Sequence, residues 1–264
     1  MDSFKAEMNS IRQNRKDGSL QILNDTIAVI MKYLASPGFS ETELVNQVTD
    51  LSKTFFDFAV LQHFISGINQ EGNTKKDFLD YLSNYKLKWH DVDRSISNHF
   101  LSRIEVNDST ILLHSNSRTI RTLFEEIARR NLSVNVFQTE SLPGGEGVLQ
   151  AEFIRKPGIT VLGIKDDDVI DHLSNLDMFL IGADRIEQEN VINKVGSLAI
   201  TKAFYKAGKP VYVLADSRKI SEDEIPVKSG LFEKVPLRLV TDIITERGLL
   251  FLYFGALHLV SKCS

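Results

Sequence analysis

Hydrophobic spacing divides the chain into two parts, with a change near residue 107. Between residues 19 and 100, apolar side chains recur every three or four positions, which is the spacing of one face of an α-helix. Pro37-Gly38 interrupts the first run, and Ser40 to Glu43 has the capping-box pattern that opens a second helix. Residues 1–106 are therefore expected to form an N-terminal helical domain.

After residue 107, short apolar runs alternate with amphipathic helical segments. Fully apolar strands separated by helices are typical of a parallel sheet with helices on both faces. Residues 107–264 are predicted to form a Rossmann-like α/β domain with a doubly wound, mainly parallel sheet. The expected strands are 110–113, 134–137, 159–162, 178–181 and 211–214, and the expected helices are 118–130, 147–155, 167–173 and 197–207.

Polar side chains follow each of these expected strands. A doubly wound sheet binds ligands at the carboxyl ends of its strands, so these side chains are candidate binding residues. Helix caps use the same residue types, and capping alone produces part of the pattern. The polar segments are His114 to Ser117, Thr139 to Ser141, Asp166 to Asp168, Gly182 to Asp184 and Asp216-Ser217.

The first two segments suit a phosphorylated ligand. Residues 114–117 join a strand to a helix, and the free N–H groups of a first helical turn can bind a phosphate oxygen. The glycine-rich loop 139–147 allows its backbone to approach a ligand closely. The structural alternatives are a simple helix cap, a core histidine, and an ordinary loop that ends at Glu146. The expected substrate contacts here are His114, Asn116, Ser117, Glu140 and Ser141.

A third segment places an acid and a lysine close together in sequence. Asp184 follows a strand, and Asn193-Lys194 precede a helix that is expected to begin near Gly196-Ser197. A lysine beside a helix N-terminus can bind an anion, and a carboxylate across from it can serve as general base or accept a sugar hydroxyl. The alternative is a surface ion pair between Asp184 and Lys194 or Arg185, which would contribute little stability.

Composition narrows the function classes. A net charge of −4 does not suit sequence-independent nucleic-acid binding, and the chain lacks Walker and dinucleotide-binding glycine motifs. The single cysteine, Cys263, stands next to the last residue, and the six histidines lack metal-ligand spacing. No metal or cofactor is expected. We find no secretory signal and no membrane-length apolar run, so a cytoplasmic location is expected.

The chain resembles the superfamily that unites the regulatory subunits of translation initiation factor 2B with methylthioribose-1-phosphate isomerase and ribose-1,5-bisphosphate isomerase. The resemblance is most specific in the second half; in the first half, residues 15–19 resemble the family's early arginine and glycine region. The matching segments are residues 111–117, 139–143, 182–186, 191–197, 210–213, 232–236 and 244–248.

The resemblance implies roles for two residues. In the isomerases an aspartate and a cysteine interconvert an aldose and a ketose phosphate, and these positions are Asp184 and Ser115 here. A serine hydroxyl is far less acidic than a thiol, so Ser115 is a poor proton donor or acceptor. The bisphosphate isomerases also tend to carry a phosphate-binding arginine where this chain has Leu142.

Three hypotheses follow. The first is an initiation-factor-2B-like protein that binds a phosphorylated sugar or nucleoside monophosphate without efficient isomerisation. The second is an aldose–ketose isomerase, formally an intramolecular oxidoreductase, with Asp184 as acid/base and Ser115, Glu140 or water as the second proton carrier. The third is a non-catalytic scaffold. The family implies a homo-oligomer, with a dimer formed through the C-terminal domain; involvement in translation initiation rests on the resemblance alone.

Overall fold

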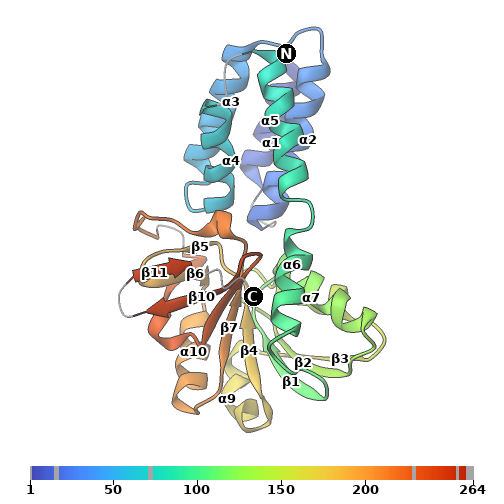
Figure 1. Ribbon diagram of the computed structural model, residues 1–264, viewed down its shortest axis with the longest axis vertical. Helices are drawn as coiled ribbons and strands as arrows, with labels where there is room; N and C mark the ends of the chain where they lie inside the picture. The colour runs from blue at the N-terminus through green and yellow to red at the C-terminus, as the bar shows by residue number, and fades with distance from the viewer. Residues whose placement is uncertain (1, 15–17, 71–73, 228–229, 254–255, 260–264) are drawn as a thin grey trace. The chain divides into compact units, whose positions relative to one another are not determined.

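The chain folds into two compact units, residues 1–91 and 92–264. The computed structural model describes residues 2–14, 18–70, 74–227, 230–253 and 256–259 (Figure 1). Arg15 and Cys263, which the sequence analysis considered, lie outside these ranges. The second unit begins before residue 107 because helix α6 (Val92–Leu101) packs against α7 (Arg118–Arg129) and β9 (Asp242–Thr245).

The first unit is a bundle whose helices run alongside one another (Figure 1). Its core is made from the apolar faces of amphipathic helices, including Leu23, Leu44, Phe64 and Phe78, all nearly inaccessible to solvent. The first of these helices was not predicted from the sequence. The helices are α1 (Asp2–Gln13), α2 (Ser19–Ala35), α3 (Glu41–Thr54), α4 (Ala59–Gln70) and α5 (Lys75–Lys88).

The capping box expected at Ser40 forms only in part. The Ser40 side chain accepts a hydrogen bond from the Glu43 N–H at 3.4 Å. The Glu43 carboxylate forms an ion pair with Lys5 and accepts a hydrogen bond from Gln47, and it does not accept from the backbone N–H of Ser40. A complete capping box opens α5 instead, where Thr74 and Asp77 satisfy each other's backbone N–H groups.

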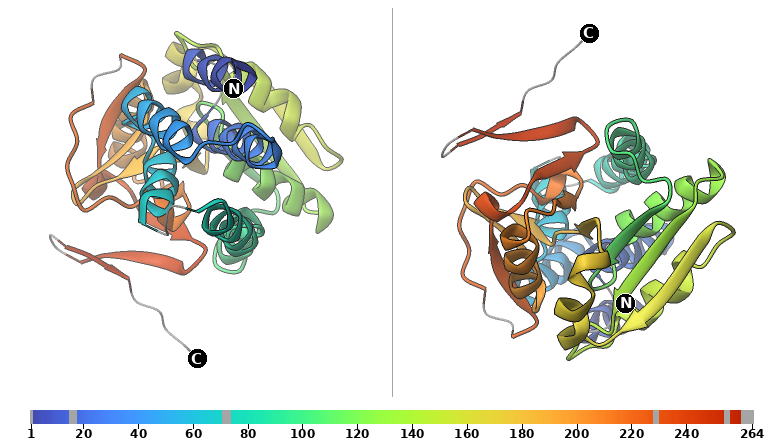
Figure 2. Two further views of the ribbon diagram at one scale, coloured as in Figure 1. Left: turned by 90° about the horizontal axis from the view of Figure 1, so that it is seen from above. Right: turned by 90° about the horizontal axis from the view of Figure 1, so that it is seen from below.

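The second unit is built on a twisted sheet, and its predicted doubly wound topology is confirmed. Its strand order is β11-β10-β9-β7-β4-β1-β2-β3, and the six strands from β9 to β3 are parallel. The β10–β11 hairpin, which is antiparallel, lies at the outer margin in both views of Figure 2. The bounds are β1 (Ser109–Leu113), β2 (Val134–Thr139), β3 (Ile159–Ile164), β4 (Met178–Ile181), β7 (Val211–Leu214), β10 (Gly248–Tyr253) and β11 (Ala256–Leu259).

Strands β1 and β4 lie side by side at the point where the chain reverses its direction across the sheet. The chain runs from β1 outward to β2 and β3, then returns to β4 and proceeds outward to β7 and β9. The two helices that follow β1 and β4 therefore diverge, and the crevice that this leaves at the carboxyl ends is where such folds bind ligands. Leu113 of β1 is in register with Leu180 of β4.

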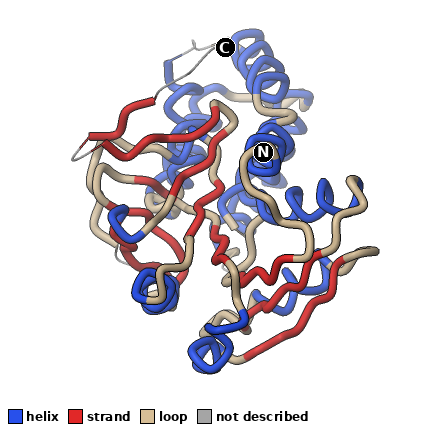
Figure 3. Tube along the Cα trace, turned by 60° about the horizontal axis from the view of Figure 1, so that its bottom comes forward, coloured by secondary structure: helices blue, strands red, loops and turns tan. Residues whose placement is uncertain are grey.

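Helices lie on both faces of the sheet (Figure 3). Helix α8 (Gly147–Ile154) packs against β2 and β3, and α10 (Ser197–Lys206) packs against β4 and β7. Residues 169–172 form the short helix α9 (Val169–His172). A cluster that includes Leu112, Phe179, Phe204 and Val213 forms the core between the sheet and α10. Among the described helices, none has both the length and the apolar character required to cross a lipid bilayer.

A second, small sheet was not predicted from the sequence. It contains β5 (Arg185–Ile186), β6 (Asn190–Lys194) and β8 (Phe232–Pro236), all antiparallel. Asn193 and Lys194 thus lie on a strand, and α10 begins three residues after Lys194. Inside this sheet the buried Arg185 contacts the Glu187 carboxylate at 2.8 Å, and Lys234 contacts the same carboxylate at 2.8 Å.

Candidate functional site

The carboxyl ends of β1 and β4 bring the two positions of the isomerase resemblance to one edge of the sheet. Ser115 follows β1 and Asp184 follows β4, and these strands are hydrogen-bonded neighbours. Both residues are partly exposed. The Asp184 backbone N–H donates to the carbonyl of Ile192 at 2.9 Å, which joins the end of β4 to the small sheet.

His114 is a buried, hydrogen-bonded histidine. Its Nε2 lies 2.9 Å from the Val195 carbonyl, which can only accept, so Nε2 carries the proton. Its Nδ1 then accepts from the Thr139 hydroxyl at 2.7 Å. Burial lowers the pKa of His114 below its ordinary value of 6.5, although the Val195 carbonyl and nearby acids oppose that shift. His114 is therefore neutral near pH 7 and supports the site rather than exchanging protons in it.

Two serines, in the loops that follow β1 and β2, adopt an unusual backbone conformation. Ser115 and Ser141 both have left-handed φ values, 69° and 65°, which are uncommon for residues other than glycine. The Ser115 N–H donates to the Ser141 hydroxyl at 2.7 Å, and the Asp166 carboxylate accepts from the N–H groups of Ser141 and Leu142 at 2.8 Å each. Backbone strain of this kind is common at ligand sites. Asp166 thus anchors the loop that faces Ser115.

A carboxylate that the sequence analysis did not choose links Ser115 to Lys194. The Ser115 hydroxyl donates to Glu146 Oε1 at 3.3 Å, and Lys194 Nζ lies 2.8 Å from the same oxygen. The Lys194 side chain is 5% exposed and that of Glu146 is 19% exposed. Such a shielded ion pair is less screened than one at the surface. Lys194 therefore has an internal counter-ion.

Two glycines allow this close packing. Gly196 has a φ of 102°, and a Cβ there would lie 3.0 Å from the His114 ring. At Gly144 a Cβ would lie 2.2 Å from Glu146 Oε2 and 3.1 Å from Lys194 Nζ. The turn at Gly144 thus covers the ion pair with backbone alone.

Asn116 and Ser117 have structural partners at the start of α7. The Ser117 hydroxyl caps the helix by accepting from the Ile120 N–H, and the Ser117 N–H donates to Gln150. Arg121 donates to the side chains of both Asn116 and Gln150. The structure therefore places Asn116 and Ser117 beside Ser115, in contacts that fix the turn.

Asn193 is also fixed by its neighbours. It is buried, and its side-chain amide donates to the Ser197 hydroxyl at 3.2 Å. Lys194 and Arg185, the two cations considered as partners of Asp184, are both buried; Lys194 contacts the Glu146 carboxylate, and Arg185 contacts that of Glu187.

Lys219 is a second buried cation that the sequence analysis missed. It lies in a short 3-10 helix after β7 (Ser217–Lys219), is 5% exposed, and donates to the Ala183 carbonyl at 2.6 Å. Among the described residues, no carboxylate lies within ion-pair distance of its amine. The sequence signal that could identify Lys219 is its place two residues after the polar pair Asp216-Ser217.

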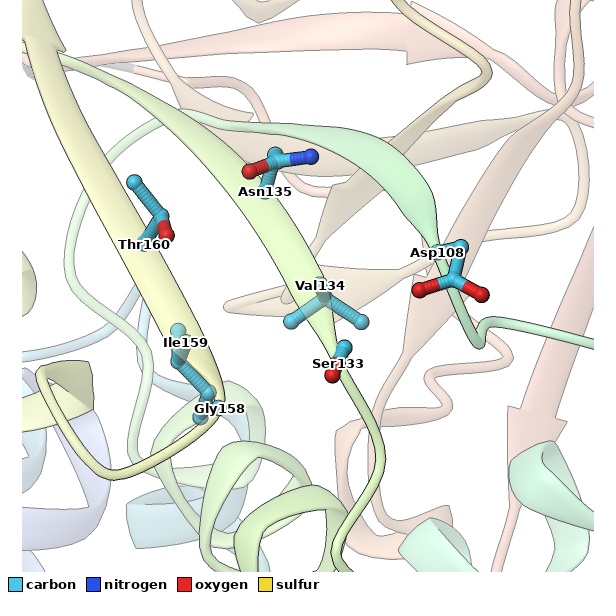
Figure 4. A pocket seen from close by; sticks show the side chains of 7 residues that line it. All are labelled: Asp108, Ser133, Val134, Asn135, Gly158, Ile159 and Thr160. Carbon is cyan, nitrogen blue, oxygen red and sulfur yellow. The ribbon is translucent and has the colours of Figure 1, made fainter.

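Among the described residues, the Glu140 side chain forms no hydrogen bond or ion pair with Ser115, Glu146 or Lys194, and the Glu140 backbone carbonyl accepts from the Gly147 N–H at 3.2 Å. It is exposed and lines a small hollow of about 190 Å³ that also includes Glu152 and Arg155. A larger polar hollow, of about 420 Å³, lies at the opposite end of the sheet, between the amino ends of β1, β2 and β3 (Figure 4). The predicted site residues do not line that larger hollow.

Potential metal-ligating side chains do not gather into one group in the described ranges. Within them, no group of three or more histidine, cysteine, aspartate or glutamate side chains is arranged to hold a metal ion. The acidic run Asp166 to Asp168 forms a 3-10 turn, and Asp166 is used as the loop anchor described above.

The fold and this edge define a class of protein: a helical N-terminal region followed by a doubly wound α/β sheet with a polar, partly buried cluster at its switch point. A sequence profile of the Initiation factor 2 subunit family matches residues 5–229. The chain belongs to that family, as its sequence motifs predicted.

Comparisons with individual proteins agree. The chain is 24% identical over 224 residues to a putative translation initiation factor eIF-2B subunit 2-like protein of Pyrococcus abyssi, covering 78% of this chain and 79% of that protein. It is 25% identical over 219 residues to ribose 1,5-bisphosphate isomerase of Methanocaldococcus jannaschii, covering 72% and 70%. The match to a related Pyrococcus furiosus protein spans only 57% of that protein.

Solved structures show the same fold. The translation initiation factor eIF-2B of Pyrococcus horikoshii OT3 superposes with a TM-score of 0.82 at 20% identity, covering 94% of this chain and 97% of that one. The 5-methylthioribose 1-phosphate isomerase of the same organism gives 0.75 at 15% identity, covering 94% and 84%. The fold is therefore common to factor subunits and isomerases, and function must be argued from the site.

Proposed function

We propose that this protein binds a phosphorylated sugar or nucleoside monophosphate at the carboxyl edge between β1 and β4, without efficient isomerisation. The observation that carries the proposal is Lys219, a buried amine at this edge that contacts a carbonyl and, among the described residues, has no carboxylate partner. A buried unpaired charge is costly, and a ligand phosphate would offset that cost. Asp184, at the neighbouring strand end, would accept a sugar hydroxyl.

The absence of efficient catalysis is proposed from Ser115. Its hydroxyl is a much weaker acid than a thiol, and its acceptor Glu146 is already engaged by Lys194. His114 offers no second base because it is buried, and its two ring nitrogens are engaged by Thr139 and Val195. The site thus supports recognition better than proton transfer.

Thermal unfolding in the presence of ligands tests the binding proposal. Ribose 5-phosphate and adenosine monophosphate should raise the melting temperature of the wild type, because a ligand that binds only the native state stabilises it. Lys219→Met should lose most of that shift, whereas Lys202→Met, in the exposed part of α10, should keep it.

If none of these ligands shifts the melting temperature of the wild type, the scaffold hypothesis is favoured. Turnover of ribose 1,5-bisphosphate or methylthioribose 1-phosphate at enzyme-like rates, abolished by Asp184→Asn, would contradict the proposal.

The second candidate is an aldose–ketose isomerase, and the Ser115–Glu146 contact is the observation that favours it. In such a reaction a base removes a proton from the carbon next to the carbonyl, and an acid returns a proton to the neighbouring carbon. Asp184 and Ser115, with Glu146 in place of Glu140 because it contacts the Ser115 hydroxyl, would be the groups involved. On this candidate Ser115→Ala abolishes turnover, and unchanged turnover in that variant would remove Ser115 from the reaction.

We also propose that the protein forms a homodimer through its C-terminal unit and acts in the cytoplasm. Support comes from exposed apolar side chains on α8, where Val148, Leu149 and Phe153 are about half exposed. Sedimentation equilibrium gives the mass in solution. A monomer at micromolar concentration would contradict the dimer.

A further inference from the structure

The loop that covers Lys194 brings negative charge to the candidate site. Residues 139–147 contain two glutamates and neither lysine nor arginine. One of these carboxylates, Glu146, lies within 2.8 Å of Lys194 Nζ and accepts from the Ser115 hydroxyl at 3.3 Å. The lysine that could bind a phosphate on this side is therefore already neutralised from within the chain.

Glu146 is held by the contacts of its carboxylate with Lys194 and Ser115 and by several backbone contacts of its segment. Glu146 stands at the N-cap of α8, where its backbone carbonyl accepts from the Gln150 N–H. The preceding turn is tied to Asp166 through two backbone N–H groups and closes on itself between Gly145 and Ser141. A negative charge near a helix N-terminus is also favourable. The carboxylate is thus a fixed part of the site wall.

The two sides of the edge differ in charge. On the β7 side, Lys219 is a buried cation without a described carboxylate partner. On the Ser115 side, the Lys194 charge is cancelled and a carboxylate oxygen faces the serine hydroxyl. A phosphate fits the first side, and sugar hydroxyls, which donate hydrogen bonds to carboxylates, fit the second.

We infer that Glu146 is a specificity-determining residue that makes the site select monophosphorylated sugars and reject bisphosphates. This inference rests on the proposed binding function and names its ligand class. A second phosphate placed on the Ser115 side would find the Lys194 amine already paired and would lie beside the Glu146 carboxylate, and an unfavourable contact of this kind is a common source of discrimination between ligands. The inferred discrimination thus depends on the charge of one carboxylate.

The test compares two ligands that differ by one phosphate. Isothermal titration should show that the wild type binds ribose 5-phosphate more tightly than ribose 1,5-bisphosphate. Glu146→Gln keeps the size of the side chain and removes its charge, and it frees the Lys194 amine; the affinity ratio should move towards the bisphosphate by about tenfold or more. Glu152→Gln changes the net charge equally from an exposed position of the same helix and should leave the ratio unchanged.

A second variant guards against misfolding and separates charge from packing. Glu146→Asp keeps the charge with a shorter side chain, so it should keep the preference for the monophosphate. A wild type that prefers the bisphosphate, or a Glu146→Gln variant with an unchanged ratio, would overturn the inference while leaving ligand binding intact. If the wild type binds neither sugar phosphate nor adenosine monophosphate, the proposed function fails, and the inference fails with it.

Discussion

At the scale of single residues, a hydrogen-bond chain fixes the protonation of His114. The Ser115 N–H donates to Ser141, the Ser141 hydroxyl to Thr139, and the Thr139 hydroxyl to His114 Nδ1, while Nε2–H donates to Val195. A proton on Nδ1 would force Thr139 and Ser141 to reverse their donors. The neutral ring is therefore built into the wall of the candidate site.

This protonation state predicts how stability depends on pH. Because burial lowers the folded-state pKa of His114, the unfolded chain binds a proton first as pH falls below about 6.5. Stability should fall there by at most about 1.4 kcal/mol per pH unit, until the folded-state pKa is reached. Urea unfolding at pH 7.5 and 5.5 measures this change. The difference in free energy of unfolding between the wild type and His114→Gln should be smaller at the lower pH. His90→Gln, on a side chain that is 77% exposed, is the matched control for the loss of a histidine.

At the residue scale, the sequence singles out candidate residues where a local motif marks them. Ser115 and Lys194 both lie in recognisable sequence motifs, and their side chains contact the same oxygen of Glu146. From the sequence, Glu146 is expected only to lie in a helical first turn. Its contacts with Ser115, 31 positions earlier, and with Lys194 depend on the tertiary fold. The spacing of residues along the chain does not predict such a long-range contact.

At the scale of elements, the loop between β2 and α8 depends on an acid from the next strand end. Asp166 follows β3 and accepts from two backbone N–H groups of the loop. These are charge-assisted hydrogen bonds, which are stronger than bonds between neutral groups.

Removing this acid should loosen the loop without unfolding the sheet. Asp166→Ala should reduce the free energy of unfolding by about 1–3 kcal/mol, because two N–H groups lose a charged acceptor. Hydrogen exchange of residues 139–147 should accelerate, and ribose 5-phosphate should bind more weakly. Asp167→Ala, at the exposed neighbouring position, serves as the control. Equal exchange rates in the two variants would show that Asp166 does not anchor the loop.

The sequence predicted the strands that alternate with helices between residues 107 and 214, but not the later strands β9, β10 and β11 of the same sheet. The five expected parallel strands all form, with ends that differ by up to two residues. The small sheet was missed because β5 has two residues and β6 ends in Asn193-Lys194, a polar pair that reads as a loop. Its strands are specified by pairing with β8 near residue 232, which local periodicity does not reveal.

At the scale of the whole molecule, the small sheet is held by a buried charge cluster. The Glu187 carboxylate forms ion pairs with Arg185 and Lys234, and it also accepts a hydrogen bond from the Ile225 N–H at 3.0 Å. Burial alone would raise the pKa of Glu187, but the hydrogen bonds from Lys234, Ile225 and Arg185 outweigh it and hold the pKa below its usual range. The cluster thus ties residues 185–187 to the segments near 225 and 234.

Neutralising this carboxylate should be costly for the whole fold. Glu187→Gln leaves buried Arg185 beside an amide, and breaking a buried pair costs about 3–5 kcal/mol. The lowered pKa means that the stabilisation is present above the ordinary value of 4.5 and is lost as pH falls below it. Wild type and variant should therefore converge in stability in acid. Glu189→Gln, an exposed neighbour, should match the wild type throughout.

The contact between Ser115 and Glu146 also constrains the order of mutations by which this chain could acquire a reactive thiol. A cysteine introduced at position 115 would meet a carboxylate where the serine hydroxyl now donates. A nearby negative charge disfavours the thiolate, the reactive form of cysteine. Position 115 is thus epistatic with position 146: the serine-to-cysteine change gains nothing until the carboxylate is neutralised. A laboratory route to a nucleophilic site in this protein begins at Glu146.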